Sequence, residues 1–531
     1  MKREEIPDTY DAIVIGSGIS GMATASIIAQ MRKWKVLVVE SHFTLGGYTH
    51  AFKRKGYEWD PGFHYVGEME PGTQTRDCMD LVTGGQVEWQ KLDEGFEQLV
   101  FPDVTLEVPS SPEEHKELLK KEFPDEIAGI EQYFEDIYKM RNWSTIWYFS
   151  KLFPNWLSKL VSAGKKRKLA ETLTQDYLDE HIKNPLLKAV LTSQWGDYGT
   201  PPGRSAFGVH GMVAADFMAG GYYAIGGAQK ISHSAKQMVE SFGGHCMTRH
   251  KVTEILIENN KAKGVAVETK HGPRSFYAPR IISAAGIDTT FNKLVPETYA
   301  KKEREKLKNH IRGVSATILF MGIKDDPRKY GYKDTNYWMF DKLDHRYEDK
   351  KEFPPSIGNT TLSFASLRNP SLKKHVAQLV TFSAYDDWED HSGTVWRKRG
   401  DEYAKKKEIY IETLLDFVEE RFPGLRDIIE FRELSTPLTF ESMTNHVNGQ
   451  VYGRECNQDR IKEDWNIQTS VKNLYLTGSD ICIPGINSAL MMGVMTASRF
   501  VQPYPLGITR VLKHAASGKK VDLSSLLRAD A

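Results

Sequence analysis

The stretch YDAIVIGSGISGMATASIIAQMRKWKVLVVE, residues 10–40, decides the fold. An apolar, β-branched run up to Ile15 predicts a strand, and the small and apolar residues from Met22 to Met31 predict a helix. A second apolar run predicts a strand that ends at Glu40, which lies 19 positions beyond Gly21 (40 − 21). A G-x-G-x-x-G motif alone is weak, but a strand, this motif, a helix, a strand and an acid in that order are typical of a Rossmann unit. The sequence therefore predicts an α/β protein that binds a dinucleotide.

Each glycine of the motif has a physical role in that interpretation. Gly16 permits the tight turn, Gly18 lets the backbone approach a pyrophosphate, and Gly21 lets the helix pack closely on the strand. The amino end of the helix adds a partial positive charge that favours phosphate. Glu40 is placed to accept hydrogen bonds from the ribose hydroxyls, which disfavours a 2′-phosphate and therefore NADP. The alternative is a glycine-rich turn in an ordinary α/β fold.

The residues after Glu40 favour FAD over NAD. Residues 45–49 read Leu-Gly-Gly-Tyr-Thr, and a second glycine-flanked stretch occupies residues 56–65. In NAD dehydrogenases the chain after the acid normally continues the sheet, whereas Gly46 and Gly47 let the backbone run close to a cofactor. We therefore predict FAD as the cofactor.

Composition and charge exclude several classes of protein. The chain has 531 residues, which favours two or three domains. Lys and Arg together number 70, as do Asp and Glu, so no overall field favours nucleic acid. The four cysteines are scattered without paired spacing, which predicts neither a disulfide scaffold nor a metal site. No uncharged apolar run approaches the roughly 18–20 residues needed to span a bilayer, and the N-terminus lacks a signal-like segment, so we predict a cytoplasmic protein.

Residues 16–67 resemble the phytoene desaturase, carotenoid isomerase and retinol saturase superfamily of flavoproteins. The string Gly-Phe-His-Tyr-Val-Gly at residues 62–67 is most similar to the retinol saturase branch. Residues 220–227 resemble an aromatic and double-glycine segment of the family, and residues 436–453 resemble a further stretch. The resemblance implies an FAD-dependent oxidoreductase with a Rossmann-type domain of the glutathione reductase and amine oxidase-like class and a discontinuous substrate domain.

Residues 473–493 are similar to the second flavin-binding block of these enzymes. They predict a strand, a turn at Gly478, an acid, Asp480, and a helix opened by Gly485 and Ile486. The dipole of that helix would stabilise a negatively charged reduced flavin. The resemblance also implies that the residue matching Val252 contacts adenine through its backbone. The predicted cofactor-binding residues are Gly16, Ser17, Gly18, Ile19, Ser20, Gly21, Glu40, Gly46, Gly47, Tyr48, Thr49, Val252, Gly478, Asp480, Gly485, Ile486 and Asn487.

The sequence departs from the commonest family pattern at two places. Tyr48 stands where many relatives carry Arg after the double glycine, and the string Ile-Cys-Ile-Pro at residues 481–484 is atypical. These departures leave the branch and the substrate open.

The chain divides into interleaved segments. We predict that residues 1–100, 220–300 and 430–505 form the FAD-binding domain, that 100–220 and 300–430 form the substrate domain, and that 506–531 form a C-terminal tail. The sequence contains no second strand, G-x-G-x-x-G and helix unit. We therefore expect an external electron donor or acceptor.

Two aromatic runs lie in the predicted substrate domain. The first occupies residues 143–161 and precedes the basic string Lys165-Lys-Arg-Lys168. It fits a pair of helices that contacts a membrane surface peripherally, and it fits equally a core-packed pair with a solvated basic end. The second run would line a tunnel for a polyene or pack in the core. It comprises Phe320, Tyr330, Tyr332, Tyr337, Trp338 and Phe340.

Candidate acid–base residues come from the two glycine-flanked blocks. We single out His64, Tyr65 and Tyr222 as catalytic candidates, with Tyr223 and His210 beside them. A histidine that titrates near neutrality is a natural proton donor for the reduction of a double bond. The alternative for His64 is a structural hydrogen bond beside the cofactor.

Four functions remain to be separated. The first is a saturase or reductase acting on a carbon–carbon double bond of a lipophilic polyene or isoprenoid. The second is a carotenoid-type desaturase or a cis–trans isomerase. An amine oxidase and a flavoprotein without turnover are the remaining alternatives, and an FAD site this complete usually serves chemistry.

Overall fold

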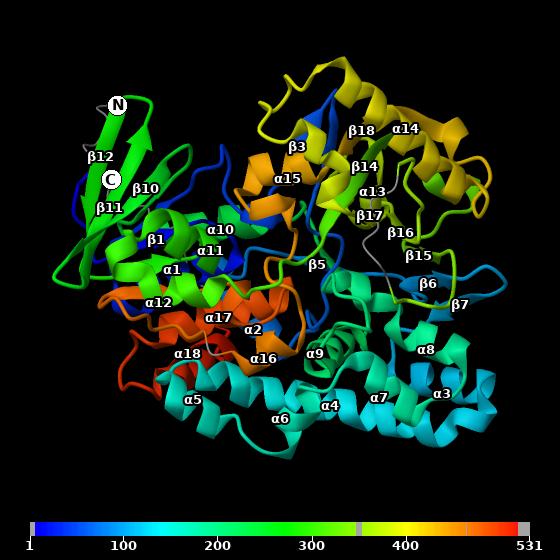
Figure 1. The fold of residues 1–531 in the computed structure, drawn as a ribbon, viewed down its shortest axis with the longest axis horizontal. Helices are drawn as coiled ribbons and strands as arrows, with labels where there is room; N and C mark the ends of the chain where they lie inside the picture. The colour runs from blue at the N-terminus through cyan, green and yellow to red at the C-terminus, as the bar shows by residue number, and fades with distance from the viewer. Residues whose placement is uncertain (1–5, 347–352, 464, 519–531) are drawn as a thin grey trace.

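The computed structural model describes residues 6–346, 353–463 and 465–518 (Figure 1). A parallel five-stranded sheet has the strand order β19-β13-β1-β2-β9 and draws its strands from both ends and the middle of the chain. The chain runs outward from β1 through β2 to β9, and then returns to the other side of β1 with β13 and β19. Ligands bind at such a reversal, outside the carboxyl ends of the strands. The strands are β1 (Ala12–Ile15), β2 (Val36–Val39), β9 (His245–Met247), β13 (Ile281–Ser283) and β19 (Leu474–Leu476).

Helices and a small sheet pack around these strands. Helix α1 packs between α17 and α10, and α2 packs against α10, α17 and α18. The three-stranded antiparallel sheet β10-β11-β12 forms the green lobe at the upper left of Figure 1. Their bounds are α1 (Ile19–Arg32), α2 (Gln74–Thr83), α10 (Gln229–Glu240), α17 (Ile486–Ser498), α18 (Gly507–Ala516), β10 (Lys251–Glu258), β11 (Lys261–Thr269) and β12 (Gly272–Tyr277).

The predicted Rossmann elements are confirmed. Strand β1 begins at Ala12 rather than at Tyr10, and α1 begins at Ile19, inside the glycine motif. The apolar runs form strands because all four residues of β1 and of β2 are buried. Such fully buried strands are typical of a parallel sheet covered on both faces.

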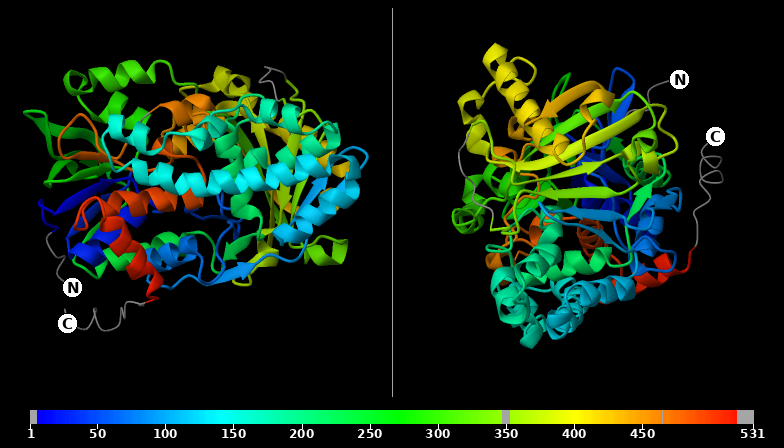
Figure 2. Two further views of the ribbon diagram at one scale, coloured as in Figure 1. Left: turned by 90° about the horizontal axis from the view of Figure 1, so that it is seen from below. Right: turned by 90° about the vertical axis from the view of Figure 1, so that its right-hand side faces the viewer.

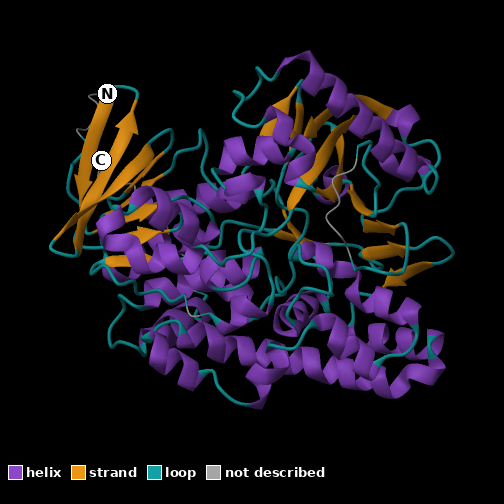
Figure 3. Ribbon diagram, in the orientation of Figure 1, coloured by secondary structure: helices purple, strands orange, loops and turns teal. Residues whose placement is uncertain are grey.

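A second, seven-stranded sheet has the order β18-β14-β17-β16-β15-β6-β7. Its pairs are antiparallel except for β15 with β6. Helix α14 (Gly400–Glu419) lies beside it, and the buried Tyr410 and Leu414 of this helix join a separate apolar core with strand residues such as Leu319 and Leu379 (Figure 3). The strands are β6 (Glu97–Val100), β7 (Thr105–Val108), β14 (Ser315–Ile323), β15 (Asn336–Phe340), β16 (Asn359–Ser363), β17 (His375–Ser383) and β18 (Ile429–Ser435).

The proposed domain boundaries fall within this architecture as follows. The boundary at residue 100 coincides with the end of β6, and the boundary at residue 430 falls inside β18, so both adjoin the seven-stranded sheet. The predicted tail begins with α18, which packs on α2, whereas residues 519–531 lie outside the described part of the chain. The division into domains stays a proposal.

A layer of helices forms the lower part of Figure 1 and is seen from below in Figure 2. Its longest member, α4 (Ile127–Ser150), packs against α9 (Phe207–Phe217) and buries Trp143 and Trp147, whose rings stack with centroids 5.6 Å apart. Helix α5 (Asn155–Val161) follows, with Trp156 71% exposed. The aromatic run is thus core on α4 and exposed on α5. The other helices are α3 (Pro112–Glu122), α6 (Lys165–Ala170), α7 (Thr174–His181) and α8 (Pro185–Thr192).

Short elements complete the described chain. Among the residues described, no helix combines the length and apolar character needed to cross a membrane.

The hairpin β3–β4 and the pair β5–β8 join the glycine-flanked blocks to the rest of the fold. These elements are β3 (Phe52–Arg54), β4 (Tyr57–Trp59), β5 (Trp89–Lys91), β8 (Tyr222–Ala224), α11 (Ile287–Thr289), α12 (Glu297–Leu307), α13 (Ala365–Arg368), α15 (Pro437–Thr444) and α16 (Gln458–Lys462).

Candidate functional site

A cavity of about 1110 Å³ extends from the carboxyl ends of β1, β2, β13 and β19 to the seven-stranded sheet. Every residue predicted to bind the cofactor lines it, except Asn487. The side-chain amide of Asn487 donates hydrogen bonds to the carbonyl of Gly67 at 3.1 Å and to the Asp216 carboxylate at 3.3 Å. The segments at 16–21, 46–49 and 478–486 are far apart in the sequence, and the fold brings them to one wall.

The glycine loop after β1 has the geometry that its sequence predicts. Gly16 has φ +96°, which favours glycine, and a Cβ on Gly21 would lie 2.3 Å from the Gly16 carbonyl oxygen. A Cβ on Gly18, by contrast, would meet nothing within 4 Å. Gly18 therefore faces open space in the cavity, at the amino end of α1, where no acidic residue occupies the first turn.

Glu40 organises this loop. Its carboxylate accepts hydrogen bonds from the Ser17 backbone N–H at 2.9 Å, from the Ser17 hydroxyl at 2.6 Å and from the His42 N–H at 2.8 Å. Ser17 Oγ in turn accepts a hydrogen bond from the N–H of Gly46 at 3.1 Å. One buried acid thus ties the glycine loop to the double-glycine segment.

Asp480 joins the segment at 478–486 to the chain that follows β13. Its carboxylate accepts a hydrogen bond from the N–H of Ile287 at 3.0 Å, and a Cβ on Gly453 would lie 2.3 Å from it. Gly478 and Gly485 have φ +113° and +103°, and a Cβ on either would meet nothing within 4 Å. Glycine at these positions leaves space open toward the cavity.

The wall fits a dinucleotide. Two buried polar atoms on it, Thr477 Oγ1 and His42 Nε2, have no hydrogen-bond partner among the described residues. Buried polar groups are normally paired, so such atoms indicate a ligand or water that completes them. The first turn of α17 contains no acidic residue, which leaves its amino end suited to negative charge.

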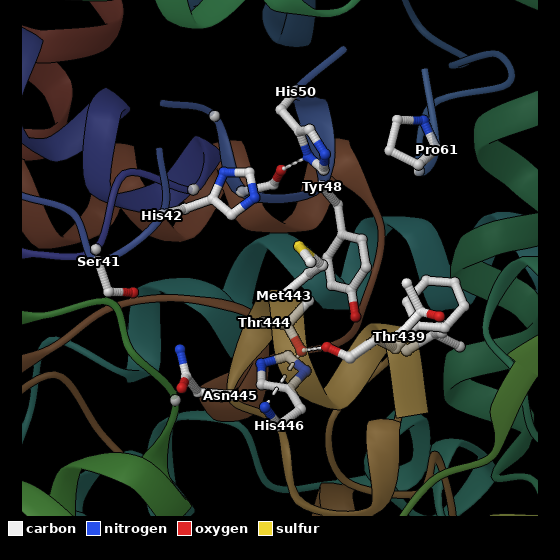
Figure 4. Close-up of a pocket in the computed structure, with 18 of the residues that line it drawn as sticks. Ser41, His42, Tyr48, His50, Pro61, Thr439, Met443, Thr444, Asn445 and His446 are labelled. Carbon is white, nitrogen blue, oxygen red and sulfur yellow. Dashed lines mark hydrogen bonds between the residues drawn. The ribbon is translucent and has the colours of Figure 1, made fainter. Parts of the chain in front are cut away.

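The opposite wall is largely apolar. It comes from the facing sides of β14, β17 and β18 and from α15, and Figure 4 shows the Tyr48 ring pointing from its loop toward Thr439 and Thr444 of this helix. The Tyr48 hydroxyl donates a hydrogen bond to the Gln450 carbonyl at 3.4 Å, and burial raises the pKa of this phenol, which stays neutral. The apolar lining consists of Ala316, Ile318, Phe320, Val380, Phe382, Leu434, Phe440 and Met443.

The comparisons with known proteins agree with this geometry. Residues 14–81 match the model of the NAD(P)-binding Rossmann-like domain. All-trans-retinol 13,14-reductase from Danio rerio is 30% identical over 526 residues, which cover 93% of this chain and 86% of that protein. The chain belongs to the retinol saturase and carotenoid isomerase superfamily. Chloroplastic prolycopene isomerase from Arabidopsis thaliana is 28% identical, with 94% of this chain and 84% of that protein covered.

The fold class is confirmed as well. The solved structure of cyclohexylamine oxidase from Brevibacterium oxydans superposes with a TM-score of 0.57 at 15% identity, covering 98% of this chain and 100% of that one. As a member of the superfamily, the protein is an enzyme of the flavin-dependent oxidoreductase type.

The three catalytic candidates do not lie in one site. His64 lines the cavity, whereas neither Tyr65 nor Tyr222 is among the described residues that line it. The Tyr65 hydroxyl contacts the carboxyl groups of Glu97 and Asp197, and the Tyr222 hydroxyl donates a hydrogen bond to Glu70. Their placement does not support a direct role in proton transfer for these two tyrosines.

The neighbouring candidates are structural. Tyr223 donates its hydroxyl hydrogen to Asp60, and His210 is buried between the hydroxyl groups of Tyr133 at 2.9 Å and Tyr198 at 3.2 Å. Of the second aromatic run, Phe320 lines the cavity. Tyr332, Tyr337, Trp338 and Phe340 are buried in core packing, and Tyr330 is exposed.

The pKa of His64 lies below the near-neutral value typical of a histidine proton donor. Burial, and secondarily the positive charge of Arg368, lower the pKa of His64 from 6.5 to about 4. The same Arg368 donates a hydrogen bond from Nη1 to the His64 carbonyl at 2.8 Å. At pH 7 the imidazole is therefore neutral, so it can orient a ligand through its one N–H but is not an imidazolium acid.

We expect that His64→Gln leaves the pH dependence of turnover unchanged between about pH 5.5 and 8, because the neutral imidazole does not titrate there. Its turnover should fall by about tenfold or less, since one hydrogen-bonding group replaces another. The measurement is the pH–rate profile of both proteins. A limb near pH 6.5 in the wild type that disappears in the variant would show that His64 does titrate in the working range.

Sequence reasoning missed part of the cavity wall. Tyr452 and His446 lie within residues 436–453, which resemble the family, so a signal for them existed, but neither was singled out. Trp396, Arg399 and Tyr403 also line the cavity, from the region where α14 begins, and no motif marks them.

Proposed function

We propose that this protein binds FAD in the cavity and uses it to reduce a carbon–carbon double bond of a lipophilic polyene, as a retinol saturase-like enzyme. The observation that carries the proposal is the continuity of one cavity from the glycine loop to an apolar wall on β14 and β17. A dinucleotide and an apolar substrate can meet within it. The similarity to all-trans-retinol 13,14-reductase over 93% of the chain supports reduction of a polyene.

The protein's own residues divide the work of holding FAD. The amino end of α1, beside Gly18, would take the pyrophosphate, and Glu40 the ribose of the adenosine half. The backbone at Val252 would contact the adenine, and the amino end of α17, at Gly485 and Ile486, would face the flavin ring. FAD supplies the two-electron chemistry. The apolar wall excludes water, and neutral His64 orients the substrate by hydrogen bonding.

Electrons must reach this site from outside the chain, because the sequence contains only one strand, G-x-G-x-x-G and helix unit. We propose an external electron donor, either a small reductant or a partner protein.

A peripheral contact with lipid is part of the same proposal. Trp156 and Leu160 of α5 are 71% and 68% exposed and precede the basic string 165–168, a combination suited to an anionic lipid surface. Helix α5 lies at the lower edge of Figure 1, whereas the apolar wall of the cavity lies on β14 and α15 in the upper half. A contact through α5 would therefore lie away from the apolar wall of the cavity.

The test is the mass of the product. We expect all-trans-retinol, incubated with the flavin-loaded protein under reducing conditions, to gain the mass of two hydrogens. Phytoene and poly-cis carotenoids are run in parallel under reducing and oxidising conditions. Loss of two hydrogens would establish a desaturase instead. An unchanged mass with an altered absorption spectrum would establish a cis–trans isomerase, the second candidate, which the similarity to prolycopene isomerase favours.

A further inference from the structure

A cluster of one phenol and two carboxyl groups lies behind the cavity wall, with Tyr65 and Glu97 buried and Asp197 half-buried. Tyr65 Oη is 2.5 Å from Oε1 of Glu97 and 2.7 Å from Oδ2 of Asp197. Tyr65 immediately follows His64, Glu97 begins β6, and Asp197 ends a short helical turn at residues 193–197. Glu97 is 1% exposed. None of the proposed cofactor contacts uses these groups.

The two distances determine a minimum number of protons. A phenol carries one hydrogen and can donate it to one carboxyl oxygen only. Separations of 2.5 and 2.7 Å are hydrogen-bond lengths for O–H···O, so each contact needs a proton between its two oxygens. With Tyr65 neutral, the second proton belongs to a carboxyl group. One of the two acids is therefore protonated.

The hydrogen-bond partners identify which one. Oε2 of Glu97 accepts a hydrogen bond from Gln194 Nε2 at 2.9 Å, and its Oε1 accepts one from Trp338 Nε1 at 3.3 Å. Several donors stabilise a carboxylate, whereas Tyr65 is the one hydrogen-bond partner of Asp197 among the described residues. The proton therefore lies on Asp197, which donates to Tyr65, and Tyr65 donates to Glu97.

Burial raises the pKa of both carboxyl groups, and at Glu97 the hydrogen bonds from Tyr65, Gln194 and Trp338 oppose the rise. Burial raises the pKa of Asp197 well above its ordinary value, and the negative charge of Glu97 raises it further. The other titratable groups that face Asp197 are Tyr65, Tyr198 and Tyr452, and burial raises the pKa of each, so they are neutral at pH 7. None of these groups offers a positive charge that would ionise the acid.

The cluster adjoins residues that line the cavity. Its Tyr65 follows His64, which lines the wall, and the carbonyl of Gly196, the residue before Asp197, accepts a hydrogen bond from the hydroxyl of Tyr452 at 2.9 Å. Tyr452 lines the wall as well. We propose that Asp197 is a neutral carboxylic acid in the folded protein, and that the hydrogen bond it donates fixes Tyr65 behind the cavity wall, beside His64.

Asp197 is not among the described residues that line the cavity, and it acts through Tyr65. It is therefore a positioning residue rather than one that touches the substrate. Its expected effect on turnover rests on the proposed function.

Infrared spectroscopy tests the protonation of Asp197 without any activity. At pH 8.5 the difference spectrum of wild type minus Asp197→Asn should contain the carbonyl stretch of a protonated carboxylic acid, displaced in D₂O. This pH lies above the pKa values of about 6 and about 7 to which burial raises Asp60 and Asp216, so their contribution is small. Absence of the band from the wild type, or its persistence in the variant, would overturn the assignment.

Asp136 provides the matched control. It is 4% exposed and accepts a hydrogen bond from the Tyr177 hydroxyl at 3.0 Å, but hydrogen bonds from Lys139 and Gln132 lower its pKa, so it is ionised. Asp136→Asn should leave the band in place. If Asp197→Asn does not fold, Tyr65→Phe gives the second readout, because loss of the phenol should shift the band without removing it. An unshifted band in that variant would contradict the contact.

Turnover tests the positioning role. Asp197→Leu, which removes the donor to Tyr65, should bind flavin like the wild type and slow product formation by about tenfold, whereas Asp197→Asn, whose amide still donates to Tyr65, should retain most of the turnover. The infrared band with unchanged turnover in Asp197→Leu would overturn the positioning role alone. A protein that shows the band but reduces no polyene would overturn the proposed function while the protonation of Asp197 stands.

Discussion

Gly18→Val should leave the fold intact and weaken flavin binding by at least about 100-fold, or about 2.7 kcal/mol. The backbone at Gly18 has φ −59° and ψ 167°, a conformation that any residue adopts, and a Cβ there would meet nothing within 4 Å. The protein alone therefore accepts the side chain. The valine would instead occupy the space in which a pyrophosphate must approach the backbone N–H groups at the amino end of α1.

Flavin content after purification and the affinity for added FAD measure this effect, with thermal unfolding of the flavin-free protein as the check on folding. Gly358→Val is a suitable control, because a Cβ at Gly358 would lie 3.8 Å from its nearest neighbour, Asp341, outside the cavity. It should keep the flavin. Full flavin occupancy in Gly18→Val would remove the glycine loop from the proposed binding site.

The sequence predicts those parts of the site in which the role of each residue depends on its near neighbours in the chain. Gly16, Gly21 and Glu40 are identified by their own spacing, because a tight turn, a close helix contact and an acid after the second strand all lie within one βαβ unit. Gly478 and Gly485 follow from the same logic at the far end of the chain. These residues do line one cavity.

The rest depends on contacts between distant segments and on burial, which spacing does not reveal. Tyr65 adjoins His64 in sequence, yet its ring packs on Phe217 with centroids 4.4 Å apart, away from the cavity. His64 lines the cavity and Tyr65 does not, so adjacency within a motif cannot assign both to one site. The lowered pKa of His64 likewise arises from burial and from Arg368, a residue 304 positions away. The apolar wall needs β14 and β17 to pair across the sheet.

Arg368→Leu should destabilise the protein by about 3–5 kcal/mol, because it leaves the buried partner Asp334 without its counter-charge. The Arg368 side chain is 0% exposed and that of Asp334 is 6% exposed, with Nε 2.8 Å from Oδ1. The guanidinium also donates hydrogen bonds to the His64 carbonyl at 2.8 Å and to the Asn336 side chain at 3.2 Å. Chemical unfolding of wild type and variant measures the loss.

A double-mutant cycle distinguishes the cost of an unpaired buried charge from the cost of the lost hydrogen bonds of Arg368. If the unpaired carboxylate dominates, adding Asp334→Leu to Arg368→Leu should recover a large part of the lost stability, because an apolar pair replaces an ion pair without a buried charge. Lys236→Leu, which breaks an exposed pair with Glu240, should change stability by less than about 0.5 kcal/mol. No recovery in the double variant would mean that the hydrogen bonds of Arg368 to the His64 carbonyl and to Asn336 dominate. The guanidinium would then act chiefly as the support that fixes His64 against the cavity.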